Sequence, residues 1–406
     1  MYVNLCQQGA CHFCQKCVAY GVANFLDPQF FERWAIREEA LAECCTTDET
    51  FFAYYDEDEL YTLNLPTTPN GYPDTERQRM EKIFCSKICI NSPYVCEVND
   101  VNIVGPEAVP VKDGGYVIDN CLGWCKRLKL GCVRALREGV LPAEGPWLCS
   151  ERKLGTVLSL VGPWTNNYTH WFQDYLTRLE GLEYYREKTG VDPDILIPRK
   201  ANEWMRDALR AVGYGPEQWI EWNGGRASVD RLIVSSVRRE RERASKRRRL
   251  VYSPTGVQWI SDHIKSNIEP EKTVPHSNRV YLSRANMSKR RVRNEDEVMD
   301  LLADWGFERY RPDELSFAEQ VTLFSNAEVI VSPHGSGLMN QIFAEDAVII
   351  ELMGKKQTIT TPATEYFYAE LLGHSYACVP GDAVGANLRT DVSGLDAVLR
   401  KLLDKE

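Results

Sequence analysis

The sequence predicts an α/β fold in which two Rossmann-like lobes face a cleft, preceded by a cysteine-rich N-terminal extension. Strand and helix patterns alternate over about 150–237 and again over about 253–406, which is typical of parallel sheets covered by helices. Thirteen of the 14 cysteines precede residue 150, and residues 1–100 hold 7 basic and 16 acidic residues. We therefore assign 1–94 to an acidic extension, 95–250 to an N-terminal lobe and 251–406 to a C-terminal lobe.

The first block alternates strands and helices after a stretch of short strands in 95–120. Apolar residues recur at helical spacing at Trp171, Tyr175, Leu179 and Leu182, which predicts one helix over 168–189. The remaining elements are a strand over 155–162, a strand over 191–198, a helix over 202–212 that ends at Gly213, and a strand over 229–236.

The second block repeats this alternation. Ser253 introduces a helix, and Ser316 with Glu319 forms a capping box at the start of another. The elements are helices over 254–268, 294–305, 316–327, 365–374 and 393–405, strands over 279–286, 307–312, 328–333 and 347–352, and a helix start over 337–343.

Composition excludes several classes of protein. The chain carries a formal net charge of −10, and general nucleic-acid binding needs Lys and Arg to replace phosphate counterions, so we expect no nucleic-acid partner. No stretch approaches the ~18 apolar residues that span a bilayer. The N-terminus, MYVNLCQQGACHFCQKC, lacks the basic and apolar regions of a secretory signal. We therefore expect a cytoplasmic protein.

A basic run interrupts the chain between the two blocks. Residues 238–249 hold eight Lys or Arg in twelve positions. Such a run can make peripheral contact with anionic lipid or an anionic glycan. The alternative is a solvated linker between the lobes, which its position favours.

A glycine-containing loop follows the strand that ends at Pro333. His334, Gly335, Ser336 and Gly337 precede a helix start that carries Asn340. Amides at a helix start bind anions, and glycine lets a phosphate approach the backbone. His334 can donate a hydrogen bond to a phosphate or a sugar hydroxyl. The alternative is a tight turn in which glycine only relieves strain.

A second candidate segment is rich in arginine. Arg284 ends a strand, Arg290 and Arg291 lie in the following loop, and Asn294 and Glu295 open the next helix. Arginine pairs with phosphate through two parallel hydrogen bonds and stays charged. Together with the glycine loop it would supply positive charge for a diphosphate. The alternative is a solvated basic loop.

The third candidate is a histidine–carboxylate pair. His170 and Asp174 are four residues apart and so share one face of the predicted helix. A carboxylate that orients an imidazole is a common general-base arrangement. The alternative is a histidine that packs on an aromatic ring.

These segments together resemble glycosyltransferase family 61. The matching motifs are NNYTHWFQDYLTRL, DILIP, VDRLIVSSV, YLSRANMSKRRVRNEDEV and SFAEQVTLFSNAEVIVSPHGSGLMNQIFAEDAVIIEL, in the family's order over about 95–400. Ser336 stands where the family has Ala, and Met339 where Thr or Val is usual. Relatives in this family include xylosyl-, arabinosyl- and O-GlcNAc transferases.

The resemblance implies a GT-B architecture and inversion at the anomeric carbon. It implies a nucleotide-sugar donor, UDP-linked, bound by the C-terminal lobe, a glycan or glycoconjugate acceptor, and no required metal. His170 is then the base, with Asp174 as second candidate. Arg284, Arg290 or Arg291 and the loop amides stabilise the departing diphosphate. Glu351, which ends a strand, is placed to bind ribose hydroxyls.

The cysteine-rich front has its own interpretation. Cys6, Cys11, Cys14 and Cys17 contain the C-x4-C-x2-C spacing of plant-type iron–sulfur proteins, and zinc is equally compatible. Reduced thiols and disulfides are the alternatives. A second hypothesis for the whole chain is therefore a metal- or iron–sulfur-binding protein whose α/β body binds a nucleotide without catalysis.

Overall fold

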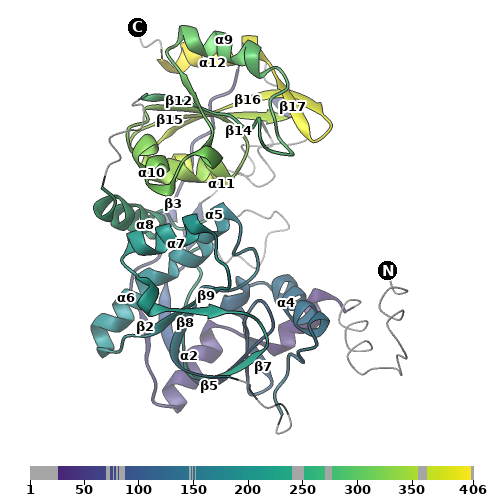
Figure 1. Ribbon diagram of the computed structural model, residues 1–406, viewed down its shortest axis with the longest axis vertical. Helices are drawn as coiled ribbons and strands as arrows, with labels where there is room; N and C mark the ends of the chain where they lie inside the picture. The colour runs from purple at the N-terminus through teal and green to yellow at the C-terminus, as the bar shows by residue number, and fades with distance from the viewer. Residues whose placement is uncertain are drawn as a thin grey trace.

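The chain folds as a mixed α/β protein, as the sequence predicts. The computed structural model describes residues 26–69, 74–75, 77–78, 81, 87–145, 148, 150, 152–239, 251–269, 277–354 and 364–403. Within these residues the strands form two large sheets and a two-stranded one, and the two large sheets lie one above the other in Figure 1.

The lower sheet in Figure 1 contains nine described strands in the order β1-β7-β6-β5-β11-β8-β9-β10, with β2 paired to β5. Strands β11, β8, β9 and β10 run parallel, whereas β5, β6 and β7 form an antiparallel meander. The sequence predicted the parallel half but missed β10. The strands are β1 (Ala35–Ile36), β2 (Phe52–Tyr54), β5 (Tyr94–Val104), β6 (Val109–Lys112), β7 (Gly115–Val117), β8 (Arg152–Ser159), β9 (Asp194–Pro198), β10 (Trp219–Trp222) and β11 (Arg226–Ser235).

The described part of 1–94 packs into the body of the protein. Strands β1 and β2 belong to the nine-stranded sheet. Strands β3 (Glu59–Tyr61) and β4 (Ile88–Ile90) pair with each other, and Ile88 and Ile90 are buried in the main core. Thr67 forms a bridge to Ala377 of the other large sheet. This segment therefore contacts both large sheets.

The predicted single helix over 168–189 is divided into three pieces. These are α5 (Tyr168–His170), a π-helical segment η3 (Trp171–Leu176) and α6 (Arg178–Thr189). All six residues of η3 are buried, so packing on every side rather than one apolar stripe decides its backbone. π-helical turns are frequent at functional sites. The other helices of this half are α2 (Glu38–Thr47), α4 (Cys125–Arg137) and α7 (Glu203–Val212), and α7 ends at Gly213 as predicted.

The upper sheet in Figure 1 has six described strands in the order β13-β12-β14-β15-β16-β17. All neighbours are parallel except β16 and β17. The strand order reverses between β12 and β14: the chain continues from β12 to β13 on one side and then returns to β14 on the other side of β12. The strands are β12 (Arg279–Leu282), β13 (Glu308–Tyr310), β14 (Val329–Pro333), β15 (Val348–Gly354), β16 (Ser375–Val384) and β17 (Asn387–Thr390); the last two were not predicted.

Helices cover both faces of the six-stranded sheet. Figure 1 shows α9 (Glu295–Asp304) and α12 (Val392–Leu403) on one face, with α10 (Phe317–Ser325) and α11 (Thr364–Leu371) on the other. The Ser316–Glu319 capping box is confirmed, and Ser253 caps α8 (Pro254–Asn267). The predicted helix start at 337–343 is a 3-10 helix, η6 (Ser336–Phe343).

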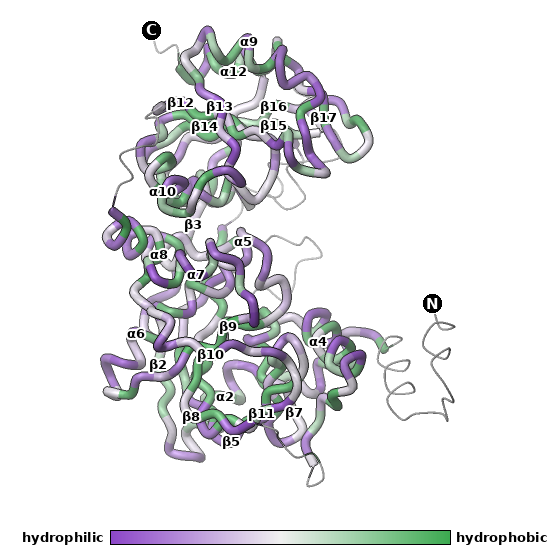
Figure 2. The backbone as a smooth tube through the Cα atoms, in the orientation of Figure 1, coloured by the Kyte–Doolittle hydropathy of each residue, from purple (hydrophilic) through white to green (hydrophobic). Residues whose placement is uncertain are grey.

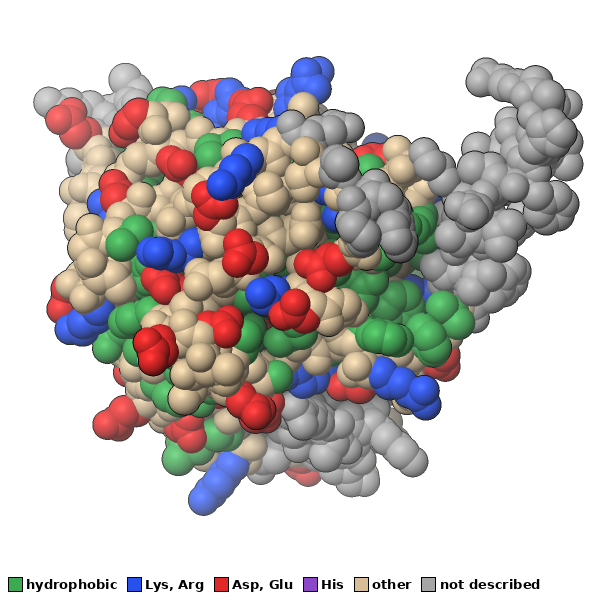
Figure 3. Space-filling view, turned by 90° about the horizontal axis from the view of Figure 1, so that it is seen from below, with side chains coloured by type: hydrophobic (Ala, Val, Ile, Leu, Met, Phe, Trp, Pro, Cys, Tyr) green, Lys and Arg blue, Asp and Glu red, His purple; other side chains and the backbone are tan. Residues whose placement is uncertain are grey.

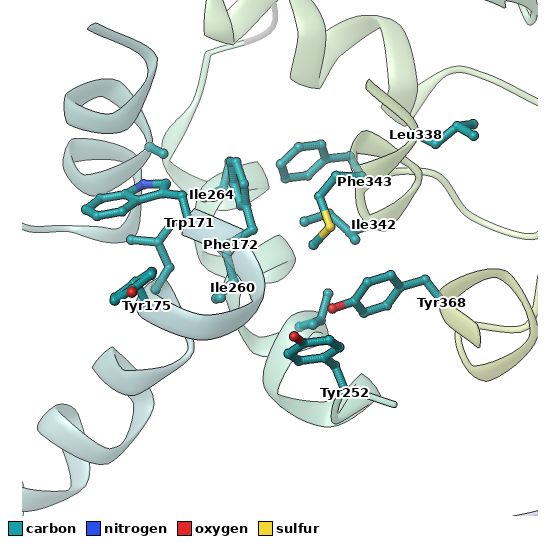
Figure 4. Packing of buried hydrophobic residues seen from close by; sticks show 14 of the residues in the cluster. Trp171, Phe172, Tyr175, Tyr252, Ile260, Ile264, Leu338, Ile342, Phe343 and Tyr368 are labelled. Atoms are coloured by element: carbon teal, nitrogen blue, oxygen red, sulfur yellow. The ribbon is translucent and has the colours of Figure 1, made fainter. Parts of the chain in front are cut away.

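An aromatic core joins the two large sheets. The largest buried cluster draws residues from both, and the hydrophobic segments of Figure 2 run through each. Figure 4 shows Phe172 of η3 facing Ile342 and Phe343 of η6, with Trp171 beside Tyr175 and with residues of α8 and α11 close by. The end of the molecule seen in Figure 3 carries acidic and basic side chains intermingled, with hydrophobic side chains exposed between them and gathered on one side.

No helix among the described residues is both long and apolar enough to cross a membrane.

Arg238 and Arg239, the described residues of the basic run 238–249, are both buried. The Arg238 guanidinium donates to Glu180 at 2.5 Å, to Glu59 at 3.2 Å and to Ser253 at 3.1 Å. The prediction of membrane contact is therefore wrong for these two residues, because neighbouring segments enclose them. The rest of the run lies outside the described residues.

Replacement of Arg238 by alanine should lower the free energy of unfolding by about 3–5 kcal/mol, because it leaves the Glu59 and Glu180 carboxylates buried without their cation. Urea denaturation measures this change. The matched control is Arg33→Ala, an exposed position where we expect a change within about 0.5 kcal/mol. Equal stability of the two variants would contradict the structural role of Arg238.

Candidate active site

Two of the predicted segments meet at the point where the strand order of the six-stranded sheet reverses. Arg284 follows the carboxyl end of β12, and His334 and Gly335 follow that of β14. These two strands are neighbours and run parallel. Ligands of open α/β sheets bind outside the carboxyl ends of the strands at such a reversal. The topology therefore brings the arginine and the glycine loop together.

The contact between Arg284 and Gly335 is direct. A Cβ added to Gly335 would lie 2.4 Å from Nη1 and 2.9 Å from Cζ of Arg284. Gly335 has extended backbone dihedrals that any residue adopts, so glycine is required by the close guanidinium rather than by backbone strain. Nε of Arg284 is buried without a hydrogen-bond partner among the described residues.

His334 is held by two carboxylates. Its Nδ1 contacts Glu351, which also accepts a hydrogen bond from Tyr376, and lies 3.7 Å from Glu365 of α11. Burial disfavours the charged imidazolium, but Glu351 and Glu365 outweigh burial and raise the pKa of His334. Burial likewise raises the pKa of Glu365 to about 7. His334 therefore carries positive charge to a higher pH than an ordinary histidine.

His334, Glu351 and Glu365 are also the described residues that could hold a metal ion. One ligand atom from each lies within 4.8 Å of the others, and all three are buried. However, Nδ1 of His334 and both oxygens of Glu351 already have protein partners. The group is complete as a hydrogen-bonded cluster, and Glu351 serves His334 and Tyr376 here rather than standing free for a ribose.

The other predicted donor-side residues fall into two groups. Arg290 adopts a left-handed backbone with φ 60°, and its charge lowers the pKa of Arg284 after the effect of burial, so it lies near the loop. Arg291 is half-buried, its amide bonded to Asn387 and its Nε without a described partner. Ser336 and Gly337 form the half-buried start of η6, whose first amides cannot bond within the helix.

Three predicted residues instead have structural partners. Asn294 bonds Thr390 of β17, and Glu295 accepts hydrogen bonds from the hydroxyls of Tyr281 and Ser283. Asn340 is fully buried between two side chains. It accepts a hydrogen bond from Tyr168 at 2.5 Å and donates to Gln320 at 2.9 Å.

The predicted pair of His170 and Asp174 forms across the start of the π-helical segment. His170 Nδ1 lies 2.5 Å from Asp174 Oδ2, and the Asp174 side chain is completely buried. The imidazole is partly exposed and stacks on Trp164, with ring centroids 4.4 Å apart. Asn167 caps this turn by accepting from the His170 amide. Both of the alternatives considered for His170 therefore hold: it has a carboxylate partner and it packs on an aromatic ring.

Contacts between the sheets link this pair to the His334 cluster. Nε2 of Gln173 lies 3.2 Å from His170 Nδ1, and its Oε1 accepts from the hydroxyl of Tyr368 at 2.9 Å. Tyr368 lies on α11, one turn after Glu365, and both Asp174 and Glu365 help to raise its pKa after the larger effect of burial. The two candidate groups therefore share Tyr368 as a common neighbour.

Sequence reasoning missed several residues of the site. Gln173 lies inside the recognised motif, but its spacing alone does not separate it from core positions. Glu365, Tyr368 and Tyr376 have no local signal, because their role depends on helix and strand placement. Cys6, Cys11, Cys14 and Cys17 lie outside the described residues.

The comparison with known protein families agrees with this geometry. Residues 168–350 match the family model Glycosyltransferase 61, a segment that includes His170, Arg284 and the His334 loop. The protein is therefore an enzyme, a glycosyltransferase. Residues 168–350 are similar to glycosyltransferase family 61, which confirms the predicted resemblance over a shorter range than about 95–400. No curated protein matches the chain.

The His334 cluster predicts a histidine that titrates above the ordinary value of about 6.5. Its charged form should stabilise the fold fully below that unfolded-state value, and the contribution should be lost as pH rises through the raised folded-state pKa. In the Glu351→Gln variant the pKa of His334 should fall, because the neutral amide no longer stabilises the imidazolium. NMR titration of the imidazole measures both, with His263→Gln, His276→Gln and His374→Gln to assign the other three histidines of 251–406. Identical titration in wild type and Glu351→Gln would contradict the carboxylate effect.

Proposed function

We propose that this glycosyltransferase is inverting and takes its sugar from a nucleotide-sugar donor. The observation that carries the proposal is the direct contact of Arg284 with Gly335 at the strand-order reversal. A guanidinium with an unpartnered buried nitrogen, beside a glycine loop that opens a helix, suits a diphosphate. The acceptor is a glycan or glycoconjugate hydroxyl.

The donor diphosphate lies over the glycine loop in this proposal. Arg284 and Arg290 supply permanent charge, and His334, protonated through Glu351 and Glu365, supplies a third cation. Charge that is fixed before the reaction stabilises a leaving group without reorganisation. These cations are why we propose that transfer needs no metal. Asn294 and Asn340 have structural partners. In this proposal they fix the positions of the segments to which the three cations belong.

His170 is the proposed base. Its Nδ1–H donates to Asp174, which leaves Nε2 as the acceptor for the proton of the attacking hydroxyl. The acceptor oxygen forms a bond to the anomeric carbon while the bond from that carbon to the phosphate oxygen breaks. The electron pair leaves with the nucleoside diphosphate, and the proton stays on His170. The buried Asp174 carboxylate then stabilises the imidazolium.

The two large sheets provide the two sides of this reaction. His170 lies after β8 of the nine-stranded sheet, whereas Arg284 and His334 lie after β12 and β14 of the six-stranded sheet. This placement supports a GT-B arrangement with the acceptor side in 95–250 and the donor side in 251–406. The aromatic junction, with Tyr368 close to both groups, supports their position across one cleft.

Arg284→Ala should weaken nucleoside-diphosphate binding by about tenfold or more, since a charge-assisted hydrogen bond contributes about 1.5–3 kcal/mol. Gly335→Ala should cause a similar loss, because the new methyl group displaces the same guanidinium. The double variant should be no worse than Arg284→Ala. Calorimetric titration of UDP, GDP, ADP and CDP, preceded by a thermal-shift screen, measures this.

Arg293→Ala is the matched control, because Arg293 is exposed on the same segment. Unchanged affinity for every nucleoside diphosphate in Arg284→Ala, or additive losses in the double variant, would refute the shared diphosphate site.

His170→Ala should lower kcat by about 10²-fold or more while donor affinity persists, because proton removal is lost and the donor side is untouched. Turnover of the nucleotide-sugar identified by the screen is measured beside nucleoside-diphosphate affinity in the same variant. His263→Ala, a histidine on α8, serves as control. Transfer by His170→Ala near the wild-type rate would reduce His170 to a packing residue on Trp164.

A further inference from the structure

Two guanidinium groups lie beside the proposed base. Cζ of Arg127 lies 3.1 Å from the ring centroid of Trp164, whose ring also stacks on His170. Cζ of Arg239 lies 4.4 Å from the ring of Trp124, which packs edge-on against Trp164. Two tryptophans thus hold two cations next to His170.

Within the described residues, neither guanidinium has a carboxylate within ion-pair distance. The Arg239 residue is 5% exposed, and its Nη1 has no hydrogen-bond partner among the described residues. Nε of Arg127 is likewise buried without a described hydrogen-bond partner. The carboxylates nearby are engaged in part: Glu32 contacts Arg37 and Cys125, Asp119 contacts Tyr94, and Oδ2 of Asp174 contacts His170. The charge of Asp174 acts on Arg127 from beyond ion-pair distance, and Oδ1 of Asp174 has no described partner. A buried cation without a partner is costly, so a ligand of opposite charge would be stabilised here.

The start of helix α4 adds to this positive charge. The helix begins at Cys125, its N-cap Trp124 offers no side-chain cap, and its first turn contains no acidic residue. That turn instead carries Lys126 and Arg127, although the helix dipole disfavours cations there. Folding alone does not favour this arrangement, whereas an anion would satisfy the amides and both guanidiniums.

The preceding residue shows what a purely structural arginine looks like in the same place. Arg238 donates to Glu59 and Glu180 and is fully satisfied within the fold. Arg239, one position later and equally buried, faces Trp124, lies beside the Tyr252 hydroxyl and has no carboxylate partner among the described residues. Arg127 is half-buried, so this member of the pair is partly accessible from solution.

We propose that Arg127, Arg239 and the start of α4 bind an anionic group of the acceptor, so that the acceptor is a glycan bearing a carboxylate or a phosphate. The proposal rests on the proposed function, in which His170 deprotonates the acceptor. The donor diphosphate has its own cations, Arg284 and His334, on the six-stranded sheet. Arg127 and Arg239 come instead from the side of the molecule that carries His170.

The first experiment uses the wild-type protein saturated with the nucleoside diphosphate found by the screen. Affinities are measured by NMR titration for methyl β-D-glucuronide, methyl β-D-galacturonide and the 6-phosphates of glucose and galactose. The uncharged methyl β-D-glucoside and methyl β-D-galactoside are the reference. We expect at least one charged sugar to bind about tenfold tighter than its neutral counterpart. The uronides and the phosphates distinguish a carboxylate from a phosphate.

The second experiment uses Arg127→Gln and Arg239→Gln. Each should remove most of that preference by weakening the charged sugar about tenfold, with the neutral sugar unchanged. Nucleoside-diphosphate affinity should stay at the wild-type value. Lys153→Gln is the matched control, because Lys153 is an exposed cation on β8 of the same sheet.

Three results would overturn the proposal. Equal affinity of charged and neutral sugars in the wild type would do so without any variant, whatever the stability of the arginine variants. Loss of nucleoside-diphosphate affinity in Arg127→Gln or Arg239→Gln would show that these arginines belong to the donor-binding site rather than to the acceptor-binding site. Failure of the wild type to bind any nucleoside diphosphate would overturn the proposed function itself and this proposal with it.

Discussion

The hydrogen bonds from Tyr168 to Asn340 and from Tyr368 to Gln173 cross between the two large sheets, and the candidate groups on both sides depend on them. All four side chains come from elements packed into one aromatic core, so neither bond can shift without disturbing that core. Figure 4 shows the result: η3 packs near Ile260 and Ile264 of α8, Phe343 of η6 and Tyr368 of α11. Because η3 is buried on all sides, its backbone departs from the regular helix that its sequence period favours, and His170 sits where that departure begins.

Two kinds of buried arginine can be distinguished in this protein: those whose guanidinium nitrogens have hydrogen-bond partners within the fold, and those with a nitrogen that has no described partner. Arg238 belongs to the first group, since carboxylates and hydroxyls from three separate segments satisfy it. Arg284 and Arg239 belong to the second, because each has a buried nitrogen without a described partner. The first kind stabilises one arrangement of segments, whereas in our proposals the second kind binds an anionic group of the donor or the acceptor. The match to a glycosyltransferase family is consistent with anion-binding arginines of the second kind, because a glycosyltransferase must bind both a donor and an acceptor.

Much of the six-stranded half could be predicted from local pattern. The helix that starts at Ser316 and the strand that ends at Pro333 have strong signals, because caps and buried runs are short-range features. Strand β16 was missed, since it reads as an irregular stretch until β15 and Thr67 pair with it. The candidate site divides in the same way. Arg284, His334 and His170 were found from residue type and position, whereas Glu365, Tyr368 and Arg239 act through contacts between distant segments.

By itself the sequence determined the α/β class, the order of most elements, the family, and the residue types that suit a diphosphate and a base. These depend on periodicity, capping and short motifs, which are properties of neighbouring residues. Only the tertiary structure decided that Arg284 lies against Gly335, that two carboxylates hold His334, and that two arginines near His170 each have a buried nitrogen without a described partner. The physical reason is that charge and hydrogen bonding depend on distance in space and on burial. Both arise only when strands far apart in the chain are placed side by side.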